Sequence, residues 1–422
     1  MVGWMLLIFF VSMFIGVPIA LSLGLAAGVL LIFVSGLPNL ITAQMMYTAA
    51  DSFNLMAIPF FILAGNLMGH GGLSKRLIDF ANMLIGGFSG GLGVIAIATS
   101  MFFAAISGSG PATVAALGTI LIPGMIKAGY ERGYSSALMA TAGAVGIIIP
   151  PSIPMILYAV QAEVSVAKIF MAGFGPGFIF GGVLLVLNYY ISRKHGYKRP
   201  SDEVPPACSW DVVFSLAMPF LVLGGIYGGV FTPTEASGVA VLYGFVVGAF
   251  VYRELDLQNI PKLLIESTIS SSVVMLIVMG ASLFSFVLIS EGTPQQLADF
   301  IRGITTSKIV ILLMINLFLL VVGCFLDAAS AIIVLTPILL PLVKAVGVDP
   351  THFGIIITVN LAVGLITPPV GLNLYVACGI SKIGIEEISQ AVLPLLGATL
   401  VALIAVTYMP WISLALPTLL GH

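Results

Sequence analysis

Long apolar runs alternate with short polar breaks along this chain, and one order of runs and breaks occurs twice. The clearest copy is the sequence AVGIIIPPSIP at residues 144–154, which returns as AVGLITPPVGL at residues 362–372. Pro368 follows Pro150 by 218 residues (368 − 150), and the same spacing relates Pro341 to Pro123. The two halves of the chain are therefore predicted to share one architecture.

Each half contains two apolar runs that are short for a membrane crossing. In the first half, residues 91–106 and 112–126 hold about 15 residues each, where a crossing needs about 20. The polar sequence SGSGP at Ser107–Pro111 separates them, so the pattern predicts a re-entrant hairpin that enters and leaves the bilayer on one side. The equivalent hairpin of the second half is expected at residues 308–325 and 332–346, with its tip at Leu326–Ser330.

The remaining apolar runs predict full membrane spans, about nine in all. Two of them, at residues 133–160 and 352–380, are helices broken at Pro150-Pro151 and Pro368-Pro369. The mildly amphipathic stretch from Leu77 to Phe88 is expected to lie along the membrane surface. The other spans are expected at residues 4–33, 53–68 (interrupted by Pro59), 168–191, 212–231, 237–252, 268–290 and 389–409.

Composition supports a membrane protein. Hydrophobic residues make up 59% of the chain, charged residues 8%, and the mean hydropathy is +1.18, whereas soluble domains carry about 25% charged residues. The three cysteines, an odd number, give no disulfide framework. The apolar segment after Met1 lacks a basic leader and a cleavage pattern, so it is expected to remain as the first span.

Basic residues predict the orientation of the spans. Arg193, Lys194, Lys198 and Arg199 lie in the most polar loop, which the positive-inside rule places in the cytoplasm. Counting spans from this loop opens the first hairpin to the cytoplasm and the second to the outside, although a few basic residues (Arg302, Lys308 and Lys344) then lie outside.

We therefore predict an all-α integral membrane protein of two inverted-topology repeats, each with a re-entrant helical hairpin and a Pro-Pro-broken transmembrane helix. The expected divisions are a first repeat at residues 1–191, a cytoplasmic loop and linking span at residues 192–236, and a second repeat at residues 237–422.

Candidate chemistry is confined to the breaks in the helices. The four histidines are expected in loops or at the tail, including His70 in the loop Gly69–Arg76, and no phosphate-binding loop is present. Interrupted helices instead expose carbonyl oxygens, which suit Na⁺, and helix N-termini, which favour a carboxylate. At least two sodium sites are expected, at Ser107, Ser109, Thr113, Gly146 and Pro150 in the first half and at Asp327, Ser330, Gly364 and Thr367 in the second. The candidate substrate-binding residues are Gly108, Gly110, Pro111, Ser152 and Asn373.

Structural roles remain open for the same residues. A proline pair commonly does no more than kink a membrane helix, and small residues such as Gly108 often serve close helix packing. Asp327 has the position of an N-cap for the helix that follows it. A cap and an ion ligand are compatible roles.

Four stretches carry a resemblance to a known family: Asp51–Met68, Phe102–Tyr130, Gly146–Ala159 and Gly364–Ala377. Over essentially its whole length the chain resembles the large membrane subunit of tripartite ATP-independent periplasmic (TRAP) transporters, which include C4-dicarboxylate and sialic acid permeases. The resemblance implies a sodium-coupled, elevator-type permease in a bacterial inner membrane, with sodium and an organic acid at the hairpin tips and the breaks. It also implies a small four-span Q subunit and a periplasmic substrate-binding protein as partners, and no nucleic acid. No Q-like segment precedes Met1, so the unfused form is expected.

Two alternative functions remain open. A stand-alone dicarboxylate permease of the same architecture would need no binding protein. An intramembrane enzyme would need a polar pair at one depth, and Asp327 has no acidic or histidine partner in either hairpin. The substrate itself is not visible in the sequence, because no arginine lies in a hairpin or a break.

Overall fold

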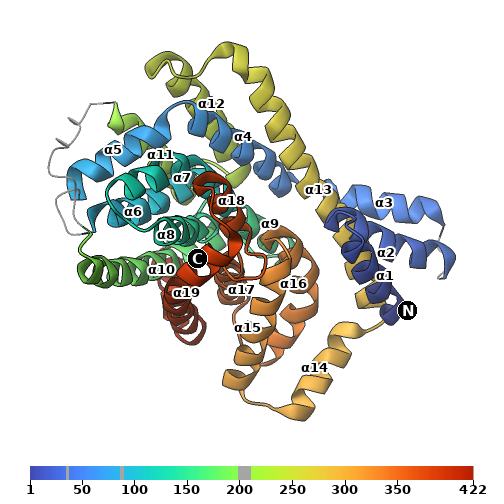
Figure 1. Cartoon of the computed structure of the whole chain (residues 1–422). Helices are drawn as coiled ribbons and strands as arrows, with labels where there is room; N and C mark the ends of the chain where they lie inside the picture. The colour runs from blue at the N-terminus through green and yellow to red at the C-terminus, as the bar shows by residue number, and fades with distance from the viewer. Residues whose placement is uncertain (35–37, 86–89, 198–210, 422) are drawn as a thin grey trace.

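Two series of helices follow one another in the same order along the chain (Figure 1). The computed structural model describes residues 1–34, 38–85, 90–197 and 211–421, so Phe88, Lys198, Arg199 and Cys208 lie outside the described residues. The helices of the first half are α1 (Val2–Phe14), α2 (Ile19–Phe33), α3 (Asn39–Ala50), α4 (Ala57–His70), α5 (Leu73–Ile85), α6 (Gly91–Ser107), α7 (Gly110–Lys127), α8 (Arg132–Ala144), α9 (Ile153–Ala162) and α10 (Val166–His195).

The second half repeats this order. Its helices are α11 (Val212–Tyr227), α12 (Pro233–Val246), α13 (Ile260–Ser290), α14 (Thr293–Ile304), α15 (Lys308–Phe325), α16 (Ala328–Ala345), α17 (Pro350–Gly364), α18 (Leu372–Ser381), α19 (Ile385–Tyr408) and α20 (Trp411–Leu419). No strand occurs among the described residues, so the all-α class is confirmed.

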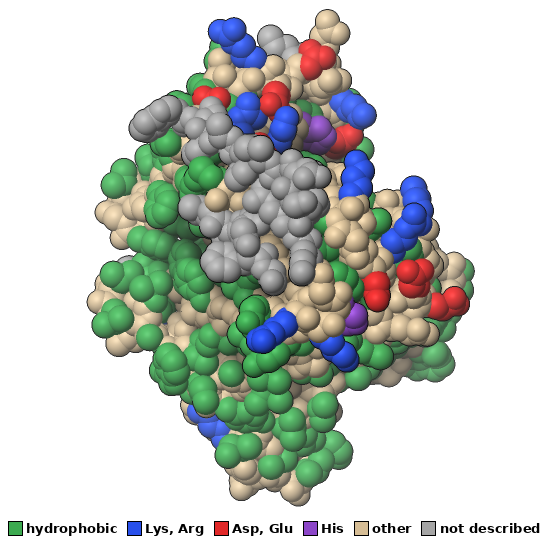
Figure 2. Space-filling model, turned by 60° about the vertical axis from the view of Figure 1, so that its left-hand side comes forward, with side chains coloured by type: hydrophobic (Ala, Val, Ile, Leu, Met, Phe, Trp, Pro, Cys, Tyr) green, Lys and Arg blue, Asp and Glu red, His purple; other side chains and the backbone are tan. Residues whose placement is uncertain are grey.

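Eight of the described helical segments are long and apolar enough to cross a membrane. Large hydrophobic side chains also face outward, for example Phe14 at 82% exposure and Phe33 at 79%. Figure 2 shows one face on which hydrophobic side chains cover a broad area, while most charged side chains gather toward the upper and right-hand edges. This is the surface of a multi-pass membrane protein, which needs apolar side chains against lipid.

The helices of one half pack reciprocally against those of the other. At the 218-residue spacing α12 corresponds to α2 and α13 to α4; α4 packs against α12, and α13 packs against α2. Likewise α18 packs against α7 of the first hairpin, and α9 packs against α16 of the second. Each broken helix therefore supports the hairpin of the opposite half, as expected of two repeats related by an approximate two-fold axis.

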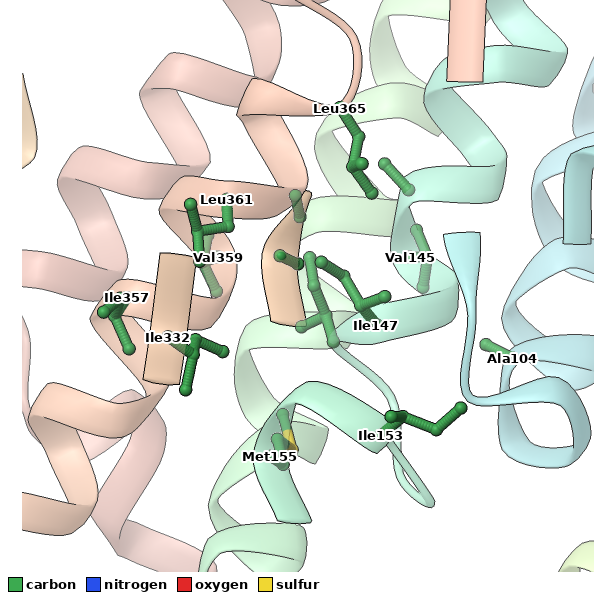
Figure 3. Close-up of a cluster of buried hydrophobic side chains, with 14 of the residues drawn as sticks. Ala104, Val145, Ile147, Ile153, Met155, Ile332, Ile357, Val359, Leu361 and Leu365 are labelled. Carbon is green, nitrogen blue, oxygen red and sulfur yellow. The ribbon is translucent and has the colours of Figure 1, made fainter. Parts of the chain in front are cut away.

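The core between the halves is apolar. Figure 3 shows Val145, Ile147 and Met155 from the first broken helix beside Ile332 of the second hairpin and Ile357 of α17, and all five side chains are buried. In a membrane such close packing, rather than a hydrophobic driving force, holds helices together.

The structure corrects the prediction of one span at residues 4–33. This segment forms two helices, α1 and α2, which pack against each other. Gly16 has a φ of +94° and Pro18 lies at the N-cap of α2, and a proline supplies no amide to continue the first helix. The prediction also missed α3. The interruption expected at Pro59 is absent, because Pro59 lies in the first turn of α4, where a missing amide is tolerated.

The described part of the amphipathic stretch predicted at residues 77–88 belongs to α5, which begins four residues earlier at Leu73. Leu73, Leu77, Ile78 and Ala81 are buried on one side of this helix. At the 218-residue spacing α5 corresponds to α14. Each of these two helices directly precedes a hairpin, which places them at the joints between the outer helices and the hairpins.

The packing between the broken helices allows a stability prediction. A side-chain carbon at Gly354 of α17 would overlap the ring of Tyr158 in α9 and come within 2.6 Å of Ile169 Cδ1. Gly354→Ala should therefore destabilise the protein by about 1–3 kcal/mol through overpacking. Thermal unfolding of the purified membrane protein measures this as a lower melting temperature. Gly379→Ala is the matched control, because nothing lies within 4 Å of the added carbon. Equal melting temperatures for the two variants would contradict the packing.

Candidate functional site

The tip of the first hairpin is a compact set of oxygen atoms. Gly108, with a φ of +61°, ends α6, and the Ser109 side chain caps α7 by accepting from the Ala112 amide. The Thr113 hydroxyl donates to the Ser109 carbonyl over 2.8 Å and lies 2.8 Å from the Ser107 hydroxyl, which is itself 3.3 Å from the Ser109 carbonyl oxygen. Ser107 and Thr113 are buried. Three oxygen groups predicted for sodium are thus neighbours.

The first break lies directly against this tip. A side-chain carbon at Gly146 would stand 2.7 Å from both the Ser109 carbonyl oxygen and Thr113 Oγ1, which only a glycine permits. The Gly108 carbonyl accepts from the Ile153 amide over 3.3 Å, at the start of α9. The structure therefore brings together Ser107, Ser109, Thr113 and Gly146. Pro150 is buried in the same break.

Ser152 has a structural role that the sequence did not separate from substrate binding. Its hydroxyl donates to the Ile147 carbonyl over 2.7 Å and accepts from the Met155 amide, so it caps α9 across the break. The side chain is fully buried. Ser152 thus satisfies one of the carbonyls that the break would otherwise leave unpaired.

The tip of the second hairpin is organised by Asp327. Its carboxylate caps α16, accepting from the Ser330 amide over 3.1 Å and from the Ser330 hydroxyl. The cap considered from the sequence is therefore present. Asp327 and Ser330 are brought together as predicted, with the carboxylate half-buried and the serine fully buried.

The second break is packed differently from the first. A side-chain carbon at Gly364 would stand 2.7 Å from backbone atoms of Gly323 in α15, so this break lies against an arm of the hairpin and not against its tip. The Thr367 hydroxyl, in the break, donates back to the Val363 carbonyl near the end of α17, over 2.7 Å. Gly364 thus packs on α15 and Thr367 bonds to the end of α17, whereas Asp327 pairs with Ser330. The four residues predicted to bind sodium in the second half therefore form two separate pairs: Asp327 with Ser330, and Gly364 with Thr367.

Asn373 of α18 lies in the first half's site and not in the second's. Its side-chain amide donates to the Ala140 carbonyl of α8 over 2.9 Å, and a side-chain carbon at Gly110 would stand 3.2 Å from Asn373 Oδ1. That oxygen is buried and has no hydrogen-bond partner. An orphaned buried carbonyl oxygen beside the start of α7 is the kind of group that a bound cation would satisfy.

One cavity of about 610 Å³ joins both hairpins and both breaks. The first hairpin contributes Ser107, Ser109 and the predicted substrate residues Gly108 and Pro111, and the second contributes Asp327. Ile147 of the first break and Leu365 of the second also line the cavity. Gly110, Ser152 and Asn373 do not line this cavity.

Outer helices complete the cavity, and the sequence reading missed them. The polar residues that these outer helices contribute to the lining are Asn66 and His70 of α4 and Ser270 of α13. The available signal was the order Gly65, Asn66, Gly69, His70, which places small and polar residues on one helical face of an apolar run. A side-chain carbon at Gly65 would be 3.4 Å from Ser107 Cα, so α4 closely approaches the first tip.

The expectation that the histidines lie in loops or at the tail is wrong for three of them: His70 and His195 are the last residues of α4 and α10, and His352 is buried in the first turn of α17. His422 lies outside the described residues.

The polar groups of the site are mostly hard oxygen ligands. Among the described residues no three histidine, cysteine or acidic side chains come together as a metal site. Hydroxyls, carbonyls and one carboxylate suit an alkali cation better than a transition metal. The first tip with its break fits a cation best, because the oxygens of Ser107, Ser109 and Thr113 lie close together against Gly146.

Comparison with known proteins shows similarity over nearly the whole chain. The family model described as "Tripartite ATP-independent periplasmic transporter, DctM component" matches residues 6–412. The C4-dicarboxylate TRAP transporter large permease protein DctM of Rhodobacter capsulatus is 41% identical, over 97% of each chain. The sialic acid TRAP transporter large permease protein SiaM of Vibrio cholerae is 37% identical, over 100% of this chain and 98% of its own.

Two further similarities concern a longer protein and a solved structure. The isethionate TRAP transporter permease protein DctMQ of Oleidesulfovibrio alaskensis is 47% identical over 95% of this chain, which spans 64% of that protein. The crystal structure of the YdaH transporter of Alcanivorax borkumensis superposes with a TM-score of 0.58 at 15% identity, covering 84% of this chain and 87% of that one. The second likeness concerns the fold alone.

Proposed function

Since the chain belongs to the family of DctM components of tripartite ATP-independent periplasmic transporters, we propose that it is the large permease subunit of a sodium-coupled importer of an organic anion. The observation that carries this proposal is the single cavity lined by both hairpin tips and both breaks. A substrate in that cavity would touch the parts of both halves whose helices are interrupted. Interrupted helices at a repeat interface are where secondary transporters bind substrates and coupling ions.

Sodium binding is assigned first to the tip and break of the first half. Ser107, Ser109 and Thr113 present hydroxyls and a carbonyl beside Gly146, and the Asn373 oxygen lies nearby without a partner. A cation held there would fix the tip against the break. A second sodium is assigned to Asp327 and Ser330, where a carboxylate supplies negative charge.

The positions of the two sodium sites explain how sodium binding would be coupled to binding of the organic anion. Ser109 and Asp327 both belong to a tip and line the cavity, so a sodium ion that orders a tip also shapes the wall against which the anion binds. The positive charge of the ions offsets the negative charge of the substrate in a site whose lining holds no lysine or arginine. Binding of either would then favour binding of the other, because such coupling is reciprocal.

Transport requires the cavity to open alternately to the two sides. The hairpins and broken helices pack on one another, and the cavity lies between their tips and residues of α4 and α13, the outer helices that also pack on α6 and α16. We assign the hairpins and broken helices to a moving body and α2, α4, α12 and α13 to a scaffold, as in an elevator mechanism. The proposed assembly adds a small Q subunit and a periplasmic substrate-binding protein in a bacterial inner membrane, since the relatives are named as TRAP permeases.

The test is uptake by vesicles that contain this chain with its small membrane subunit, supplied with the binding protein. Succinate, sialic acid and isethionate are the probe anions, after the substrates in the relatives' names. One of them should enter at least about tenfold faster with an inward sodium gradient than with potassium, and removal of the binding protein should abolish uptake. Uptake at the same rate in sodium and in potassium would contradict the coupling. Uptake without the binding protein would indicate a stand-alone permease.

A further inference from the structure

His70 presents its ring to the cavity in a defined orientation. It is the last residue of α4, it is exposed, and it lines the cavity that holds both hairpin tips. Nδ1 lies 3.0 Å from the carbonyl oxygen of Asn66, one turn earlier. Because a carbonyl can only accept, Nδ1 carries a proton. The other ring nitrogen, Nε2, then has a proton only when the imidazole is positively charged.

The cavity lacks a fixed positive charge. Among its lining residues the titratable side chains are His70 and Asp327, with no lysine or arginine. The Asp327 carboxylate is occupied by the amide and hydroxyl of Ser330. An organic anion in this cavity therefore has one side chain, His70, that can become a cation.

The other charged side chains around α4 do not line the cavity. On α5, Arg76 donates to Glu254 over 2.8 Å and to the Gly72 carbonyl over 3.0 Å, and its guanidinium lies 3.7 Å from the centre of the Tyr252 ring. It is thus held by the scaffold and is absent from the cavity lining. The remaining charged residues on the elements packed against α4 are also outside that lining: Lys75, Asp79, Glu163, Glu235, Arg253, Lys262 and Glu266.

The scaffold fixes the position of His70. The Asn66 side-chain amide donates over 2.8 Å to the hydroxyl of Ser267, which is buried in α13. This bond ties α4 to α13 at the turn whose carbonyl holds the His70 ring. The imidazole therefore reaches the cavity from α4, which is tied to α13 of the scaffold.

We propose that His70, in its protonated form, binds the anionic group of the transported organic acid from the scaffold side of the cavity. The inference rests on the proposed function and deepens it, since it names a specificity residue of the same site. Binding of the anion takes up a proton from water at Nε2, and release of the anion returns it. Imidazole is the side chain suited to this, because its charge ordinarily changes between about pH 5 and 8.

The experiment measures anion affinity at two pH values. The purified complex of this chain with its small membrane subunit, in sodium, is titrated with succinate, sialic acid and isethionate at about pH 6 and pH 8. Wild type should bind its anion at least about fivefold more tightly at the lower pH. His70→Gln, which keeps a polar side chain but no titratable one, should bind more weakly and equally at both pH values. Melting temperatures without anion verify that the variant is folded.

His195→Gln is the matched control. His195 also ends a helix, and its Nδ1 lies 3.1 Å from the Ile191 carbonyl one turn earlier, but it does not line the cavity. This variant should behave as wild type. A pH dependence that persists in His70→Gln, or that is missing in wild type, would overturn the inference.

Sodium-driven uptake by the wild-type preparation separates this inference from the proposed function. If an anion enters with sodium and His70→Gln keeps the wild-type pH dependence, the role of His70 alone is wrong. If none of the three anions binds or enters, the proposed function is wrong and the role of His70 fails with it.

Discussion

Replacing Gly146 with alanine is expected to reduce sodium-driven uptake by about ten- to a hundredfold while the protein still folds. The added carbon would lie 2.7 Å from both the Ser109 carbonyl oxygen and the Thr113 hydroxyl oxygen, closer than such atoms approach in real structures. The tip and the break must then separate, which disperses the oxygens assigned to the first sodium. Uptake by vesicles at several sodium concentrations measures the loss, and saturating sodium should restore part of the rate.

Gly124→Ala is the control for this variant. Gly124 lies on α7 of the same hairpin, and nothing is within 4 Å of an added carbon there. Its uptake and its sodium dependence should equal those of wild type. Equal sodium curves for Gly146→Ala and wild type would show that the contact between tip and break is a packing contact without a role in ion binding.

Asp327→Asn is expected to raise the sodium concentration for half-maximal uptake by about tenfold or more. Asparagine is as good an N-cap as aspartate, so α16 should keep its start, but the negative charge that favours a cation at the second tip is lost. The apparent affinity for the organic anion should fall in parallel, because the two binding events are coupled. Initial uptake rates against sodium and against anion concentration measure both effects.

Asp349→Asn provides the matched control. Asp349 caps α17 by accepting from the amides of Thr351 and His352, and it does not line the cavity. If loss of an acidic cap alone disturbed transport, this variant would share the defect. A sodium curve that does not move in Asp327→Asn would identify that carboxylate as a helix cap only.

The repeated elements of the fold could be predicted from the sequence because each carries its own local signal. The hairpins follow from short apolar runs around Ser107–Pro111 and Leu326–Ser330, and the broken helices follow from the proline pairs. The turn between α1 and α2 was missed, although Gly16 and Pro18 mark it, because the run is long enough for one span. The reciprocal packing of the halves depends on contacts between residues far apart in the sequence, such as Tyr158 with Pro350 at a separation of 192 and Asn373 with Ala140 at 233, and spacing alone does not reveal them.

The candidate site could be predicted only where neighbours in sequence are neighbours in space. Ser107, Ser109 and Thr113 lie within two helical turns and meet as expected. Gly364 does not meet the second tip, because it packs on Gly323, and the sequence gives no measure of how the hairpin arms are placed. His70 was read as a loop residue because glycines surround it, whereas α4 extends as far as His70.

The most direct test of sodium-coupled transport through this cavity is to measure radioactive sodium and labelled organic anion entering the same vesicles. The vesicles hold this chain and its small membrane subunit, and the binding protein delivers the anion. Two proposed sodium sites predict that at least about two sodium ions enter with each anion, and that both fluxes fall together in Gly146→Ala. Entry of the anion without sodium, or sodium entry that is independent of the anion, would contradict the account.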